Sequence, residues 1–265
     1  MSTETFRLVW GLNLLGLPGH ITACLFDLDG VLTDTASVHR AAWRQAFDDF
    51  LRERDGADFT PFDVDDDYNS FVDGKPREDG VRDFLASREI TLPEGNRDDQ
   101  PDEKTIWGVG NAKNAMLQKT IQTDGVRVYE GSRAYLEAAQ TAGLRRVVVS
   151  SSANAQMVLE VTGLAALIEG RIDGVTLAES DLKGKPAPDS FLAGAKLIGQ
   201  EPRQCAVFED ALAGVAAGAA GSFGYVVGVD RVGQGAKFRE HGADVVVNDL
   251  ADLLSLDSQQ SDSQQ

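Results

Sequence analysis

The chain has 265 residues, of which 42% are hydrophobic, enough for one large domain or two smaller ones with a packed core. Its 42 acidic residues outnumber its 25 basic residues and give a formal net charge of −17. Because such a charge repels another polyanion, it argues against a nucleic-acid partner. A small phosphorylated ligand remains compatible with it, since a local group of cations can outweigh a distant negative surface.

The first 19 residues are predicted to form an N-terminal extension. Their apolar stretch has no basic leading region and no Ala-x-Ala cleavage pattern, and it is too short to cross a bilayer. Cys24 and Cys205, the only cysteines, lie in apolar runs, which favours buried thiols over a disulfide or a metal site. These features predict a cytoplasmic protein with no membrane partner.

Beyond this extension, short apolar runs alternate with helical patterns. The runs predicted as strands are 21–26, 144–149, 205–208, 225–229 and 244–247. The segments predicted as helices are 132–142, 154–162, 187–198, 211–219 and 235–241. Strands buried on both faces that alternate with helices indicate a parallel sheet in an α/β fold, in which ligands bind at the carboxyl ends of the strands. We assign this core to residues 20–35 and 127–256, and we expect the polar tail 257–265 to be disordered.

Residues 36–126 have a different character, because they contain no convincing strand. Helices are predicted at 38–51, 77–88 and 112–123, and two polar stretches interrupt them. The simplest description is a helical insertion after the first strand of the core. Chain continuity would place this insertion beside the carboxyl end of that strand, so it is predicted to be a helical cap over the site.

The strongest chemical signal is the segment FDLDGVLTD, which starts at Phe26. A buried strand that runs directly into carboxylates is costly unless these are paired or bind a metal. Asp27 and Asp29 face the same way in an extended segment, and Gly30 lets the chain turn immediately afterwards. A carboxylate such as Asp27 can attack phosphorus, while Asp29 can act as the partnering acid and base.

Two further segments offer complementary groups. Glu209 and Asp210 follow another apolar run and supply oxygen ligands suited to Mg²⁺. Lys185 lies in a proline-stiffened turn before a helix, where it can neutralise charge on Asp27 and on a transferring group.

A third strand end carries hydroxyl groups. Ser150, Ser152 and Asn154 lie between a strand and a helix, where they and free N–H groups can hold phosphate oxygens. Each of these motifs alone is typical of an ordinary turn, helix cap or surface pair. Their joint occurrence, in order, at the ends of successive predicted strands favours one phosphoryl-transfer site.

At these residues the chain resembles the haloacid dehalogenase superfamily of phosphotransferases. FDLDGVLTD, VVVSSS, KPAPD and VFEDA correspond to its four motifs, and they lie within residues 21–254. The resemblance implies a Rossmann-like parallel sheet core with a helical cap inserted after the first strand. It also implies one Mg²⁺ held by Asp27, the backbone carbonyl of Asp29, and Asp210, with Glu209 nearby.

Within that superfamily the chain is most similar to the β-phosphoglucomutase family. Thr35, His39 and Trp43 follow the first motif at the spacing of that family's hinge and first cap helix, where His39 would lie close to the general acid and base. Arg77 matches the cap arginine that grips the phosphate that is not being transferred. Lys113 and the asparagine after it match a pair that contacts the sugar.

Two features depart from the family pattern. The stretch 94–109, just before Lys113, is longer and more polar than expected in the cap. Ala211 stands where these mutases commonly have serine, so one hydrogen bond is expected to be missing.

The resemblance implies interconversion of β-glucose 1-phosphate and β-glucose 6-phosphate through a phospho-aspartate and a 1,6-bisphosphate. Two alternatives remain open at this point. One is a sugar-phosphate phosphatase with the same core, and the other is a catalytically silent binding or regulatory domain. For the mutase we expect a small phosphorylated sugar as the partner and a monomeric protein.

Overall fold

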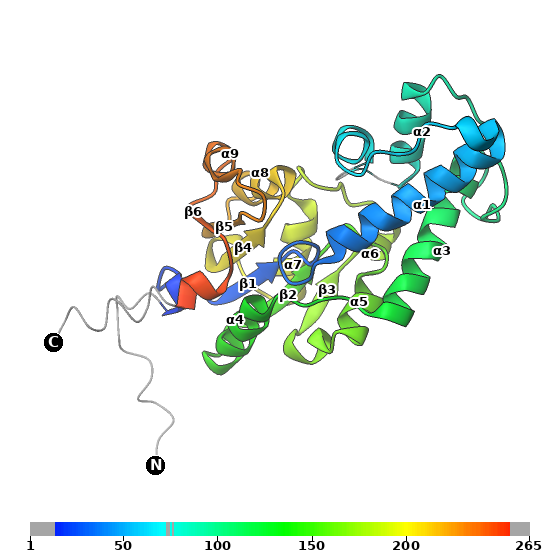
Figure 1. Ribbon diagram of the computed structural model, residues 1–265. Coiled ribbons are helices and arrows are strands. Elements are labelled where there is room, and N and C mark those ends of the chain that lie inside the picture. The colour runs from blue at the N-terminus through cyan, green and yellow to red at the C-terminus, as the bar shows by residue number, and fades with distance from the viewer. Residues whose placement is uncertain (1–13, 73–74, 76, 255–265) are drawn as a thin grey trace, which may run out of the picture. The chain divides into compact units, whose positions relative to one another are not determined.

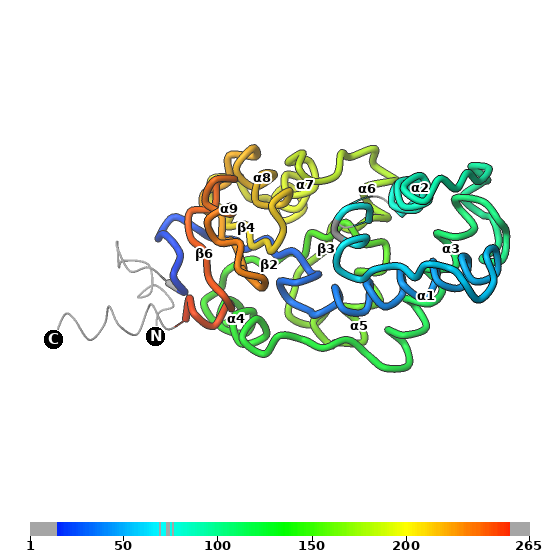
Figure 2. Tube along the Cα trace, turned by 45° about the horizontal axis from the view of Figure 1, so that its top comes forward, coloured from blue at the N-terminus to red at the C-terminus, as the bar shows by residue number. Residues whose placement is uncertain are grey.

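The computed structural model describes residues 14–72, 75 and 77–254 (Figure 1). The chain forms two compact units. The first unit contains the described residues up to Asp34 and from Arg127 onward, and the second contains those between Thr35 and Val126. Figure 2 follows the chain from β1 through the helices of the second unit and back to α4 of the first.

The first unit is built on a six-stranded parallel sheet with the order β3-β2-β1-β4-β5-β6. Its strands are β1 (Ala23–Phe26), β2 (Arg145–Val149), β3 (Gly170–Ile172), β4 (Cys205–Glu209), β5 (Tyr225–Val229) and β6 (Val245–Val247). This confirms the predicted α/β fold with a parallel sheet. The sequence pattern does not predict β3, because a strand of three residues at the edge of a sheet contains no long apolar run.

Helices cover both faces of this sheet. They are α4 (Glu130–Thr141), α5 (Ala155–Val161), α6 (Gly174–Glu179), α7 (Asp189–Leu197), α8 (Leu212–Ala220) and α9 (Gly235–Glu240). Alternate residues of β1 point to opposite faces. Leu25 packs in a cluster with Phe191 of α7 and Ala217 of α8. Phe26, on the other face, contacts Tyr135 of α4 edge-on. The sheet is therefore buried on both sides, as its continuous apolar strands require.

The strand order fixes where a ligand can bind. The chain runs from β1 outward through β2 and β3 and then returns to β4 on the other side of β1. In open α/β sheets, a crevice forms at the carboxyl ends of strands where the order reverses in this way. Here that point lies between β1 and β4.

The predicted terminal segments fall only partly within the described residues. Residues 1–13 and the tail 257–265 lie outside them. The described part of the predicted extension begins with a short 3-10 helix at Leu14–Gly16. There Leu15 and Leu17 are buried, and the hydroxyl of Tyr135 donates a hydrogen bond of 2.9 Å to the carbonyl of Leu15. This part therefore packs on the first unit.

The second unit contains helices and no strand among its described residues. Its α-helices are α1 (Thr35–Asp55), α2 (Arg77–Ser87) and α3 (Ile106–Asp124), and a π-helical turn spans Tyr68–Val72. Aromatic rings hold them together: the ring of Phe47 lies 5.1 Å from Trp43, 5.1 Å from Phe62 and 4.1 Å from Phe84, measured between centroids. The unit thus has a hydrophobic core of its own. No helix in the described parts of either unit is long and apolar enough to cross a membrane.

Candidate active site

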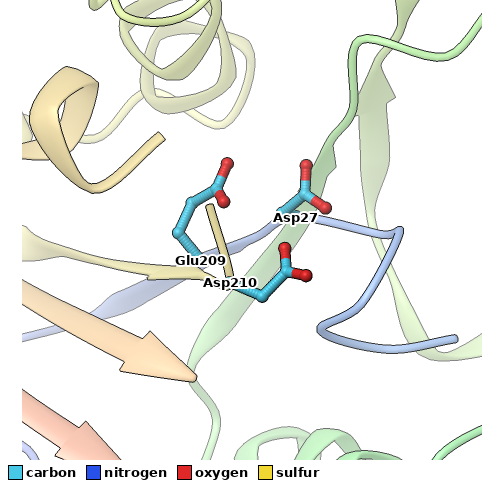
Figure 3. Close-up of side chains that lie close together, drawn as sticks. All are labelled: Asp27, Glu209 and Asp210. Atoms are coloured by element: carbon cyan, nitrogen blue, oxygen red, sulfur yellow. The ribbon is translucent and has the colours of Figure 1, made fainter. Parts of the chain in front are cut away.

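Three carboxylates converge at the carboxyl ends of β1 and β4. Asp27 directly follows β1, Glu209 ends β4, and Asp210 comes next. One carboxylate oxygen from each lies within 4.8 Å of the others (Figure 3). The register explains this convergence, because Phe26 pairs with Phe208 and the N–H of Asp27 donates to the carbonyl of Phe208 at 2.9 Å.

Lys185 supplies a cation to this cluster from the loop before α7. Its Nζ lies 2.5 Å from Asp27 Oδ1 and 2.5 Å from Glu209 Oε1, and it donates to the carbonyl of Val149 at 3.1 Å. Burial alone would lower the pKa of Lys185, but the attraction of Asp27 and Glu209 outweighs it and raises the pKa. The lysine therefore remains protonated at neutral pH.

One lysine does not neutralise the carboxylates around it. Burial raises the pKa of Asp27 well above 3.8; the charges of Glu209 and Asp29 raise it further, although Lys185 acts in the opposite direction. The pKa of Asp210 is likewise raised by removal from water, and then by Glu209 and Asp27. A second cation would relieve this repulsion.

Two glycines make room for the carboxylates. Gly30 has a φ of +88°, and a Cβ atom there would lie 1.7 Å from Asp210 Oδ2. A Cβ atom at Gly214 would lie 1.9 Å from Glu209 Oε1. The result is a compact set of oxygen donors with a surplus of negative charge, which is what a hard divalent cation such as Mg²⁺ or Ca²⁺ requires. The residues therefore fit a divalent metal site.

Asp29 and the loop after β2 form a second part of the same site. Asp29 is half-buried, and Ser150 Oγ donates to its Oδ2 at 3.1 Å. The N–H of Ser152 donates to Ser150 Oγ at 3.0 Å, and the N–H of Asn154 donates to Ser152 Oγ at 3.2 Å. These bonds fix the loop, so the predicted second motif lies beside Asp29.

Within the second unit, three of the predicted site residues form one group. His39 and Trp43 lie one turn apart on α1, and Lys113 faces them from α3. Lys113 Nζ is 3.4 Å from His39 Nδ1 and 4.8 Å from the centroid of the Trp43 ring. Lys113 is only 5% exposed, which is unusual for a lysine. Thr35 is the buried first residue of α1.

Arg77 begins α2 and has a different environment. It forms no ion pair with any described residue, and its buried Nε has no hydrogen-bond partner among them. Its side chain passes over Gly110, where a Cβ atom would lie 3.3 Å from Arg77 Cγ. Burial lowers the pKa of Arg77, Glu78 raises it, and the nearby positive charge of Arg97 lowers it. Within the described part of the chain, the guanidinium is therefore not neutralised by an ion pair.

Sequence reasoning does not identify Gly214 as part of the site. Its signal is nevertheless present, because glycine is unfavourable inside a helix and marks a close approach to another group. Gly214 lies five residues after Glu209 in α8. Only the fold shows that the approaching group is the Glu209 carboxylate.

The chain is similar to proteins of one enzyme family. A family model described as haloacid dehalogenase-like hydrolase matches residues 21–221, so the chain belongs to that family. The β-phosphoglucomutases of Mycobacterium bovis and Mycobacterium tuberculosis are each 58% identical to it over 248 residues, which cover 91% of this chain and 95% of theirs. The β-phosphoglucomutase of Bacillus subtilis is 31% identical and covers 87% of this chain and 91% of its own. Within the family, the chain is thus β-phosphoglucomutase-like.

A solved structure supports the fold. The crystal structure of β-phosphoglucomutase from Clostridium difficile matches with a TM-score of 0.68 over 91% of this chain and 98% of the other, at 24% identity. The parallel sheet with a helical region is therefore the fold seen in that protein.

Proposed function

We propose that this chain is a β-phosphoglucomutase that interconverts β-glucose 1-phosphate and β-glucose 6-phosphate through a phospho-aspartate and a bound 1,6-bisphosphate. The observation that carries the proposal is the convergence of Asp27, Lys185, Glu209 and Asp210, in a chain 58% identical to β-phosphoglucomutases over almost its whole length. The family membership supports the reaction class, and the site residues supply its chemistry.

Asp27 is the proposed nucleophile. Its carboxylate attacks the phosphorus of the sugar phosphate, the bond to the sugar oxygen breaks, and an acyl phosphate forms on Asp27. Lys185 lies 2.5 Å from Asp27 Oδ1, where its charge stabilises the negative charge that the phosphoryl oxygens carry during transfer. A buried ammonium held between two carboxylates needs no reorganisation to do this.

Asp29 is the proposed general acid and base. It protonates the leaving sugar oxygen and later removes the proton from the sugar hydroxyl that attacks the phospho-aspartate. The hydrogen bond from Ser150 Oγ to Asp29 Oδ2 orients this carboxyl group for both proton transfers.

Asp27, Asp210 and the backbone carbonyl of Asp29 are the proposed ligands of Mg²⁺, with Glu209 close by. When bound, the ion supplies electrostatic stabilisation of the transferring phosphoryl group. The charges of Lys185 and of the ion would together offset most of the negative charge of the cluster.

We propose that residues 36–126 act as a cap. A mutase must exclude water from the phospho-aspartate while it admits a sugar hydroxyl, and a closing cap does both. In this role Arg77 grips the phosphate that is not being transferred, and Lys113, with His39 and Trp43, contacts the sugar. Arg77 forms no ion pair with any described residue, which supports this role, since the guanidinium keeps its charge for a ligand.

The discriminating experiment supplies β-glucose 1-phosphate with a trace of bisphosphate and follows glucose 6-phosphate and inorganic phosphate together. A mutase converts nearly all substrate to glucose 6-phosphate. Rapid release of phosphate with little isomer would overturn the proposal and favour a sugar-phosphate phosphatase, which needs no second phosphate grip because water is its acceptor.

Arg77→Gln sharpens this experiment. Isomerisation is expected to fall about 100-fold, since a charged hydrogen-bonding group is lost, while residual hydrolysis changes far less. Arg82→Gln is the matched control: Arg82 lies on the same helix, but it is exposed and pairs with Asp79 and Glu94 at 2.5 and 2.7 Å. Equal losses of isomerisation and hydrolysis in the Arg77 variant would contradict a second phosphate-binding site at Arg77.

A further inference from the structure

Arg231 lies just beyond β5, on a side of the site that the four motifs do not include. Its guanidinium donates to the carbonyl of Gly30 at 3.0 Å and to that of Val31 at 3.3 Å. A third hydrogen bond reaches the carbonyl of Asn248 at 2.9 Å. The arginine therefore joins the loop after β5 to the tight turn that follows Asp29.

The two carbonyls that Arg231 contacts belong to the turn that shapes the site. Gly30 follows Asp29 directly, and its backbone passes so close to Asp210 that no side chain fits between them. The turn is closed from the other side by the N–H of Gly30, which donates to the carbonyl of Thr33 at 2.7 Å. The Val31 carbonyl also accepts from Ser132 Oγ at 2.7 Å, so Arg231 shares the fixing of the Val31 peptide and is the side-chain donor to the Gly30 carbonyl.

Arg231 is itself held rigidly. It forms an ion pair with Asp249 at 2.9 Å, and its guanidinium stacks over the Tyr129 ring with its central carbon 3.7 Å from the centroid. Its side chain is only 17% exposed. A planar guanidinium with fixed donors is suited to binding several carbonyls at once, which an ammonium group cannot reproduce.

Through Tyr129, Arg231 also contacts the segment around Val128, where the chain re-enters the first unit. The N–H of Tyr129 donates to the carbonyl of Leu32 at 3.0 Å, and a backbone bridge joins Thr33 to Val128. The segment after Asp29 and the segment around Val128 are therefore hydrogen-bonded to each other, and Arg231 packs on both.

We propose that Arg231 is a positioning residue, which holds the turn after Asp29 in the geometry that proton transfer and metal binding require. It acts through the Gly30 and Val31 carbonyls and touches no reacting atom. This inference rests on the proposed function for its kinetic consequence, whereas its effect on the acidic cluster does not depend on which sugar is used.

The test compares Arg231→Lys and Arg231→Gln with the wild-type protein in two measurements. The first is kcat and KM with β-glucose 1-phosphate. The second is the rise in melting temperature on adding Mg²⁺, which needs no substrate. We expect kcat to fall about 10–100-fold with KM changed by less than about 3-fold, and the Mg²⁺ affinity read from the melting shift to fall about 10-fold.

Arg231→Lys separates positioning from stability. It keeps a cation beside Asp249 but loses the fork that reaches both carbonyls, so a melting temperature near that of the wild type with a low kcat supports the proposal. Asp249→Asn retains an acceptor for Arg231 and should retain most of the activity. It disturbs the ion pair of Arg231 without removing the arginine, so it can be measured even if the Arg231 variants fail to fold. Arg133→Gln is the control, because Arg133 donates to the carbonyl of Thr162 away from the site.

The proposal is overturned if the folded Arg231 variants keep the kcat and the Mg²⁺ response of the wild type. Failure of the mutase assignment would be distinct, because it would show as absent isomerisation in the wild type. In that case a weakened Mg²⁺ response in the Arg231 variants would still support the positioning role.

Discussion

The two units contain unbalanced charge of opposite sign. In the first, Asp27, Glu209 and Asp210 crowd around a single lysine, so the cluster keeps a surplus of negative charge. In the second, Arg77 forms no ion pair with any described residue, and its buried Nε has no hydrogen-bond partner among them. The carboxylate cluster is short of cations, and Arg77 is short of an anion. In the proposed function, a metal ion answers the first need and a phosphate group the second.

This contrast distinguishes a functional site from the ordinary charged surface of the protein. Arg82 in α2 and Arg88 just after it both pair with carboxylates. Arg77 differs from both, because it is partly buried, forms no ion pair with any described residue, and has a buried Nε with no hydrogen-bond partner among them. Unpaired charge of either sign is costly when buried, so its retention points to a ligand.

The largest expected effect comes from Asp27→Asn. The amide cannot form the acyl phosphate, so turnover should fall by about 10⁴-fold or more, as is typical when a covalent nucleophile is removed. Steady-state assays of isomerisation measure this loss. Asp181→Asn is the control, because Asp181 is exposed and its φ of +51° is one that asparagine tolerates. Equal activity of the two variants would contradict the covalent mechanism.

A smaller effect, on the free energy of unfolding, is expected for Asp210→Asn. Its sign should depend on whether Mg²⁺ is present. Without metal, the variant should be more stable than the wild type by about 1–3 kcal/mol, because one buried carboxylate is removed from a crowded cluster. With Mg²⁺ at about 100 times its Kd, the wild type gains about 2.7 kcal/mol and the variant much less. Urea unfolding with and without Mg²⁺ measures both. A variant that is less stable in both conditions would contradict this description of the cluster.

The smallest expected effect concerns pH. The difference in metal-free stability between Asp210→Asn and the wild type should itself depend on pH. Burial raises the pKa of Asp27 and Asp210 above 3.8 in the folded metal-free protein, so the folded state holds protons that the unfolded state has released. The two protonated groups contribute fully to stability when the pH is below 3.8, and this contribution is lost as the pH rises through their pKa in the folded protein. The advantage of Asp210→Asn over the wild type should therefore grow as the pH rises from about 4 toward neutrality. If the stability advantage of Asp210→Asn shrinks over this pH range, the carboxylates of the cluster do not repel one another as described.

Much of the core can be predicted from the sequence. The strands that lead into Asp27 and Asp210 are predictable because a buried apolar run that stops at carboxylates is costly unless those carboxylates meet a cation. Lys185 can be placed with them because loops at one edge of a parallel sheet converge. The boundaries are harder to predict: the apolar periodicity predicts α1 at 38–51, but the helix extends over Thr35–Asp55, since its polar ends carry no such periodicity.

Other features depend on contacts that no local pattern encodes. Lys113 and His39 are 74 residues apart, and only the family resemblance suggests that both face the same ligand. Arg231 lies about 200 residues from the carbonyls it contacts, in a loop with no motif. Gly214 has meaning only once the Glu209 side chain is placed. Packing in three dimensions decides these positions.

The most direct test of the account is to locate the phosphoryl group during turnover. The protein is mixed with glucose 1,6-bisphosphate and Mg²⁺, quenched in acid, reduced with borohydride and digested, and the peptides are analysed by mass spectrometry. Reduction converts a phospho-aspartate to homoserine, so we expect homoserine at position 27 in the wild type and none in Asp27→Asn. Modification at another residue, or turnover of the bisphosphate without modification at Asp27, would contradict it.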